Sequence, residues 1–144
     1  MRRRLIYILA SALTVLLLMH SAFAVDKNIT SNYEERLLHL INRYRLMNRL
    51  NPLSTDKTLY RLAMEHCKDM NERNSLNHTA FDERFKQYKR MHCVENVGWN
   101  SPAPEDQFNG WKNSRGHNAN LLDKRIKYAG IAKAGAYVTF FACE

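Results

Sequence analysis

The chain has 144 residues, of which 45% are hydrophobic and 25% charged, and its formal net charge is +8 at pH 7. This length suits a single domain built around one core. The positive charge favours acidic partners such as anionic cell-envelope polymers or lipid headgroups. A nucleic-acid partner is not expected, because the sequence has no basic helix and no known binding motif.

The first 24 residues have the three parts of a secretory signal peptide. A positively charged opening, MRRR, precedes the apolar run Leu5–Met19, and Ala22 and Ala24 then form a small-x-small cleavage site. The alternative, a membrane anchor, needs about 20 apolar residues, more than this run contains. Cleavage near Ala24 predicts a secreted or periplasmic protein with a short N-terminal segment, 25–32, and one domain over 33–144. Its net charge from Val25 onward is +5.

Two amphipathic helices are predicted next. In segment 31–50, Ser31 and Glu34 have the spacing of a capping box. Apolar side chains repeat there at helical intervals on one face, namely Tyr33, Leu37, Leu40, Ile41, Tyr44 and Met47. Pro52 ends this helix, because proline disfavours helical backbone in the residue before it. The second helix, within 54–75, should place an inward face on the core, made of Leu59, Ala63, His66, Cys67 and Met70.

The rest of the chain predicts short elements. Segment 76–92 is expected to be a loop with a short helix, and Cys93–Trp99 is expected to be a strand. A third helix begins at Pro104 and carries Phe108 and Trp111 into the core. The last segment is typical of two strands that turn at Gly135. Two or three helices packed on a small antiparallel sheet, an α+β fold, follow from this order.

Three cysteines suit an oxidising compartment, with one disulfide and one remaining thiol. The sequence leaves all three pairings open. Cys93 with Cys143 is favoured, because both lie in or beside short strand-like runs, whereas Cys67 lies within a helical pattern. Cys67 is therefore expected to pack as a small buried apolar residue.

Three residues, His78, Glu95 and His117, are each expected at the edge of an element. His78 follows the second helix, Glu95 opens a strand, and His117 follows the third helix. Functional side chains are often held at such positions, and two histidines with one glutamate are the ligand set of an open zinc site. His66, on an inward helical face, is instead expected to be a core histidine.

Short motifs occur in the order typical of a known family. They are LNHT with His78, the Glu95-Asn96 pair in VENVGW, the pattern W-x-x-S-x-G-H that ends at His117, and Asn120 with a following leucine. Over Tyr33–Phe141 the chain resembles the CAP superfamily of cysteine-rich secretory, antigen 5 and pathogenesis-related proteins. Within that superfamily it is most similar to the compact prokaryotic-type members.

The resemblance implies a three-layer α-β-α sandwich with a central cleft, in which two histidines and two acidic residues can form a tetrad. His78, Glu95 and His117 match three of its members, and Asn96 lies beside Glu95. The second acidic position corresponds to Ser114, as it often does in prokaryotic-type members. This departure weakens any mechanism that needs two carboxylates in the cleft.

Two interpretations of the cleft remain open. His78 and His117, with Glu95 nearby, could hold zinc or another divalent metal, because neutral imidazoles suit such ions, and a bound water could then be activated for hydrolysis. In the other interpretation the residues form a hydrogen-bonded cluster, with Glu95 accepting from a histidine or from backbone amides. Ser114 is expected to end the third helix rather than act as a nucleophile, because S-R-G-H is not a strained strand-to-helix turn.

The expected function is that of a secreted, monomeric binding or interaction module rather than an enzyme. The resemblance implies a lipid, a sterol, or a cell-surface or host protein as the partner. The alternative is a metal-dependent, peptidase-like hydrolase that uses the same cleft.

Overall fold

A computed structural model of the chain describes residues 33–144. The predicted signal peptide, the segment 25–32 and the Ser31 half of the predicted capping box lie outside the described residues. Within them the helices and strands follow one another in this order: α2 (Tyr33–Met47), β1 (Ser54–Thr55), α3 (Lys57–Arg73), α4 (Phe81–Tyr88), β2 (Cys93–Trp99), α5 (Pro104–Asn113), α6 (Arg115–Leu121), β3 (Tyr128–Ala134) and β4 (Tyr137–Cys143).

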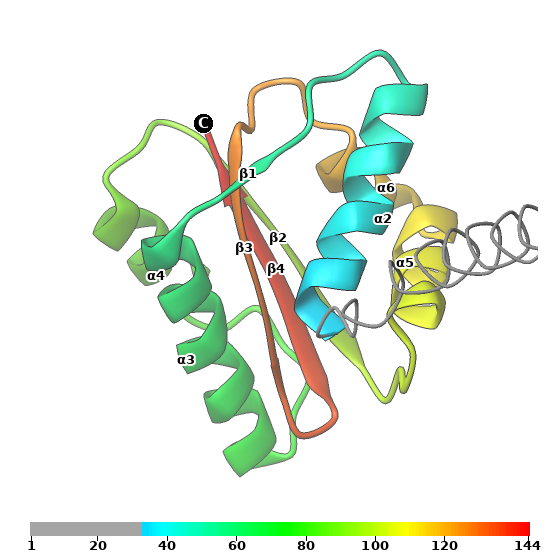
Figure 1. The fold of residues 1–144 in the computed structure, drawn as a ribbon. Helices are drawn as coiled ribbons and strands as arrows, with labels where there is room; N and C mark the ends of the chain where they lie inside the picture. Colours follow the sequence, from blue (N-terminus) through cyan, green and yellow to red (C-terminus); the bar gives the residue numbers. More distant parts are fainter. Residues whose placement is uncertain (1–32) are drawn as a thin grey trace, which may run out of the picture. The chain divides into compact units, whose positions relative to one another are not determined.

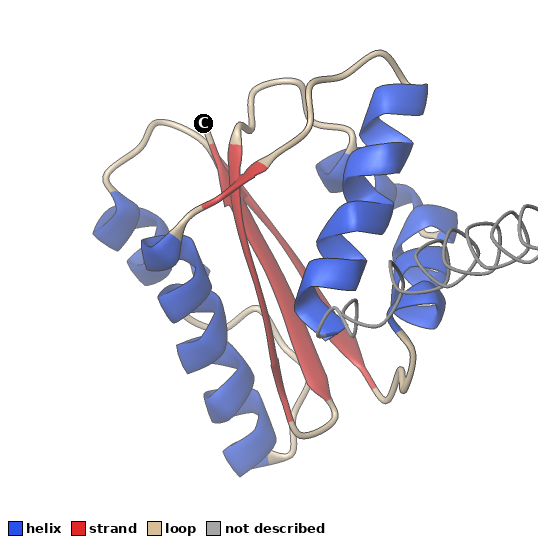
Figure 2. Ribbon diagram, in the orientation of Figure 1, coloured by secondary structure: helices blue, strands red, loops and turns tan. Residues whose placement is uncertain are grey.

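The sheet has the strand order β1-β3-β4-β2 and lies between two layers of helices (Figures 1 and 2). Helices α3 and α4 cover one face, and α2, α5 and α6 cover the other. This arrangement confirms the predicted α+β, three-layer sandwich. One detail differs from the prediction: β1 pairs parallel with β3, so the sheet is mixed rather than antiparallel. A strand of two residues is too short to leave a periodic signal in the sequence.

The sheet divides the core in two, because alternate side chains of a strand point to opposite faces. On β2, Val94 packs with the cluster under α2, α5 and α6, which includes Trp111. Val97 packs with the cluster under α3 and α4, which includes Cys67. The five inward residues predicted for α3 are all buried: Leu59, Ala63, His66, Cys67 and Met70.

The predicted apolar face of α2 is wrong at its C-terminal end. Met47 is 79% exposed, and Arg45 is buried instead. The Arg45 guanidinium donates to the carbonyl oxygens of Asn51 at 3.0 Å and Leu121 at 2.8 Å. Burial of the charge is possible because these carbonyls satisfy its donors, and the contacts join the end of α2 to the segment before β3.

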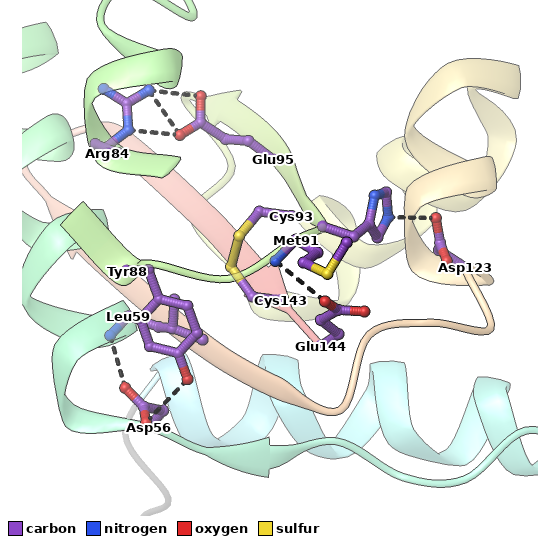
Figure 3. The surroundings of a disulfide bond; sticks show 11 residues. Asp56, Leu59, Arg84, Tyr88, Met91, Cys93, Glu95, Asp123, Cys143 and Glu144 are labelled. Atoms are coloured by element: carbon purple, nitrogen blue, oxygen red, sulfur yellow. Dashed lines mark hydrogen bonds and ion pairs between the residues drawn. A yellow bond between two sulfur atoms is a disulfide. The ribbon is translucent and has the colours of Figure 1, made fainter. Parts of the chain in front are cut away.

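Three further sequence predictions are confirmed: the disulfide, the buried thiol and the glycine turn. Cys93 and Cys143 form a disulfide between directly opposed residues of β2 and β4 (Figure 3). Cys67 stays a buried thiol, and its sulfur donates to the carbonyl oxygen of Ala132. Gly135 makes the β3–β4 turn with a φ of +56°, a conformation that favours glycine. None of the helices in the described part is long and apolar enough to cross a membrane.

Candidate functional site

The candidate site surrounds β2, which forms one edge of the sheet. The side chain of Glu95 points toward α3 and α4, where it meets Arg84. The side chain of Asn96 points the opposite way, toward α6, where it donates to the carbonyl oxygen of His117 at 3.0 Å. Residues from both helical layers therefore contact this one outer strand.

Glu95 is buried and forms an ion pair with Arg84 (Figure 3). The Arg84 Nε donates to Oε2 at 2.9 Å, and its Nη2 donates to Oε1 at 2.8 Å. This two-point contact is the strongest geometry for an arginine–carboxylate pair. Arg84 also donates through Nη1 to the carbonyl oxygen of Thr79 at 2.7 Å, which fixes the loop that carries His78.

His78 lies in the loop before α4, and its Nδ1 is 2.9 Å from Oε1 of Glu95. Because the carboxylate is an acceptor, the neutral ring carries its proton on Nδ1 in this contact, which leaves the Nε2 lone pair for another partner. The side chain is 52% exposed to solvent. Glu95 therefore orients His78, and Arg84 neutralises the charge of Glu95.

His117 lies in α6, which is attached to β2 by two asparagines. Besides the Asn96 contact, Asn120 donates to the carbonyl oxygen of Glu95 at 3.0 Å and to Oδ1 of Asn96 at 2.9 Å. Partial burial lowers the pKa of His117, and the positive charge that the nearby His78 carries when it is protonated lowers that pKa further. The two imidazoles thus lie within electrostatic range of each other, and the His117 ring favours its neutral form.

His66 also lies beside the carboxylate of Glu95, in addition to Arg84 and His78. Its Nε2 is 2.9 Å from the carbonyl oxygen of Asn77 and 3.7 Å from Oε1 of Glu95, and its side chain is almost completely buried. The prediction of a core histidine is confirmed. Burial lowers the pKa of His66, more than the attraction of Glu95 raises it.

Stability should therefore fall as the solution becomes acidic. The unfolded chain takes up a proton on His66 near pH 6.5, but the folded protein takes it up only at lower pH. The free energy of unfolding thus decreases as the pH falls below about 6.5. Urea unfolding at several pH values should show that the free energy of unfolding decreases less with falling pH in His66→Gln than in wild type. His39→Gln, on the exposed surface of α2, serves as the control, and equal slopes in wild type and His66→Gln would contradict this prediction.

Two expected positions differ from those observed. Glu95 is the third residue of β2 rather than its start, and His117 lies within α6, a short helix that the sequence did not predict. Ser114 lies at the junction of α5 and α6 and ends the third helix, as expected. Its side chain makes no capping hydrogen bond with the described residues.

The sequence analysis did not identify Arg84 as part of the site, although the sequence contains a signal for it. Phe81, Phe85 and Tyr88 repeat at helical spacing and pack against the core. Arg84 occupies a position on the same stripe, and a charged residue in an apolar stripe indicates a buried counter-ion.

The carboxylate of Glu95, one of the three predicted metal ligands, is engaged by protein groups. No group of three or more His, Cys, Asp or Glu side chains within residues 33–144 is arranged to hold one. Both oxygens of Glu95 are already bonded to Arg84 and His78. The two imidazoles remain as metal ligands. In metal sites a carboxylate commonly accepts a hydrogen bond from a metal-binding histidine.

Comparisons with known proteins agree with this architecture. An uncharacterised protein of Bacillus subtilis, YkwD, is 29% identical over 108 residues, which are 70% of this chain and 42% of that protein. An uncharacterised membrane protein of the same species, YlbC, is 27% identical over 120 residues, 78% of this chain and 35% of that protein. The chain thus spans less than half the length of these curated relatives.

Solved structures show the same fold. An extracellular protein from Bacillus anthracis that contains an SCP domain has a TM-score of 0.73 at 24% identity, over 78% of this chain and 40% of that one. An outer surface protein from Borrelia burgdorferi has a TM-score of 0.70 at 21% identity, over 75% of this chain and 89% of that one. The model of the cysteine-rich secretory protein family, CAP, matches residues 38–144. The chain therefore belongs to the CAP family.

Proposed function

We propose that this protein is an extracellular binding module that contacts its partner through His78 and His117 beside β2, the outer strand of the sheet. A location outside the cytoplasm is supported by the predicted signal peptide and the disulfide. It also agrees with the descriptions of two structural neighbours as an extracellular and an outer surface protein.

The arrangement of Glu95 is the observation that carries the proposal. Its carboxylate is buried, neutralised by Arg84 and hydrogen-bonded to His78. A carboxylate held in this way can orient an imidazole, but it cannot accept a proton from water without breaking an interior ion pair. A binding role needs only the oriented imidazoles, which the site provides.

The alternative of a metal-dependent hydrolase has less support. A zinc hydrolase site of the two-histidine, one-glutamate type needs the glutamate as a ligand, and here Arg84 occupies that carboxylate. Ser114 replaces the second acidic residue of the tetrad that the CAP resemblance implies, so Glu95 would have to serve as both ligand and base.

Zinc or another divalent ion is compatible with the proposal, with the two histidines as its protein ligands. His78 would bind it through Nε2 and His117 through a ring nitrogen. The lowered pKa of His117 assists, because only a neutral imidazole can bind a metal. A bound ion would supply a positive centre that attracts an oxygen ligand of the partner.

Among the expected partners, an anionic surface fits the charge of the chain best. The net charge of +5 after the predicted cleavage favours anionic envelope polymers and acidic lipid headgroups over sterols or neutral lipids. Binding to such a surface should weaken as the ionic strength rises, because salt screens exposed charges.

Calorimetric titration of zinc into the purified protein tests the site. We expect His117→Ala and His78→Ala each to weaken zinc binding at least about tenfold, because each removes one of two ligands. His39→Ala, an exposed histidine on α2, is the matched control and should bind like wild type. An equal response in wild type and His117→Ala would contradict the site.

A further inference from the structure

The opposite edge of the sheet is only partly covered. β1 lies beside β3 but pairs only with Tyr128 and Ala129. From Gly130 to Ala134, β3 has a strand partner on one side alone, β4, among the described residues. Figure 1 views the molecule from this edge, and β3 continues beyond β1 between α2 and α3.

The backbone groups that face outward can be identified from the β1 contact. The Asp56 amide donates to the carbonyl oxygen of Ala129 at 3.0 Å. Backbone groups of alternate residues point the same way, so the amides and carbonyls of Ile131 and Lys133 also point to this open edge. An edge strand with free donors and acceptors is a template for pairing with another chain.

A cavity of about 270 Å³ lies on this edge where β1 ends. It is lined by residues 129–131 of β3, by Leu38 of α2 and by Tyr60 of α3. Three of the four charged residues that line the cavity are acidic: Glu34, Glu35 and Asp56, against Lys57. An acidic lining is notable in a chain whose overall charge is positive.

We propose that the Gly130–Ala134 edge binds an extended basic peptide as an added strand that continues the line of β1. At about 3.3 Å per residue, the free edge accommodates roughly five peptide residues. Alternate side chains of such a strand point to opposite faces. One set would lie toward α2, with basic groups near Glu34, and the other would lie over the Tyr60 ring, where apolar groups fit.

A single extended segment fits this edge better than a second copy of the protein. The edge lies between Leu38 and Tyr60, on helices of opposite layers, so a sheet that carries its own flanking helices would collide with them. The site is also separate from the proposed histidine site, since β2 and the β1–β3 pair lie at opposite ends of the strand order.

Fluorescence anisotropy with a labelled lysine–valine–lysine–valine–lysine peptide tests the proposal. We expect saturable binding, and binding at least about tenfold weaker for the same peptide with glutamate in place of lysine. Two further peptides carry N-methyl groups at the odd or the even residues. One of the two should lose binding about tenfold and the other should retain it, because only alternate amides of an added strand face β3.

Matched variants separate backbone pairing from charge. Lys133→Pro removes one outward amide at an edge position that tolerates proline, whereas Lys133→Val keeps the amide and removes the same positive charge. We expect only Lys133→Pro to lose affinity about tenfold. Glu34→Lys should also weaken binding, whereas Glu83→Lys, likewise in the first turn of its helix, should not.

Amide hydrogen exchange provides an independent readout. The Ile131 and Lys133 amides should exchange rapidly in the free protein and become protected when the peptide binds. The proposal is overturned if both N-methylated peptides bind as tightly as the parent, or if Lys133→Pro and Lys133→Val behave alike. It is also overturned if the two amides are already protected in the free protein, as they would be in a dimer.

Discussion

Replacing Arg84 with methionine should lower the free energy of unfolding by about 3–5 kcal/mol. Glu95 is buried, and Arg84 is the cation that neutralises it at 2.7 Å. Methionine keeps the apolar stem that packs in α4 but leaves a carboxylate without a counter-ion in the interior. The loss should be measured by chemical denaturation at neutral pH.

A matched control is available in the exposed pair of Arg61 and Glu65 on α3, with a nitrogen–oxygen distance of 2.7 Å. Arg61→Met should cost less than about 1 kcal/mol, because exposed ion pairs contribute little. Adding Glu95→Leu to Arg84→Met should recover part of the loss, since it removes the unpaired charge. If Arg84→Met lowers the free energy of unfolding no more than Arg61→Met does, the buried Arg84–Glu95 ion pair is contradicted.

Removing the disulfide should lower the free energy of unfolding by a similar amount. Cys93 and Cys143 are 50 residues apart in sequence, and closing a loop of that length lowers the entropy of the unfolded chain by the equivalent of about 4 kcal/mol. The double variant Cys93→Ala with Cys143→Ala should therefore unfold at a much lower denaturant concentration than wild type.

Reduction with a thiol provides the control for the disulfide prediction. Reduced wild type and the double variant should have nearly the same stability, and the variant should not respond to the reductant. The bond also joins the ends of β2 and β4, and Glu95 lies two residues beyond Cys93, so its loss should loosen the histidine site too. A difference below about 1 kcal/mol between oxidised wild type and the variant would contradict the loop-closure argument.

Much of the fold could be predicted because the responsible patterns are local. The inward face of α3 repeats at helical spacing, and Gly135 marks a turn between two strand-like runs. The elements that were not predicted depend on tertiary contacts. β1 exists only because β3 lies beside it, and the short α6 is held by Asn96 and Asn120 against β2.

The site, too, combines residues that local motifs predict with tertiary contacts that they do not. The motifs point to His78, Glu95 and His117, and the structure brings all three to β2. The Glu95 carboxylate that contacts His78 is held by Arg84. The position of Arg84 against Glu95 depends on how α4 packs. Arg45 is a parallel case, because its buried guanidinium binds carbonyl oxygens from segments far apart in sequence. Sequence spacing can place a charge on an inward stripe, but it does not reveal the partner.

The most direct test of the site is the protonation state of the histidine rings, measured by long-range proton–nitrogen NMR near neutral pH. The structure predicts that His78 carries its proton on Nδ1, toward Glu95. Stoichiometric zinc should then shift the ring nitrogens of His78 and His117 together and leave those of His39 unchanged. A His78 ring protonated on Nε2, or equal zinc shifts at His39, would contradict the proposed binding site.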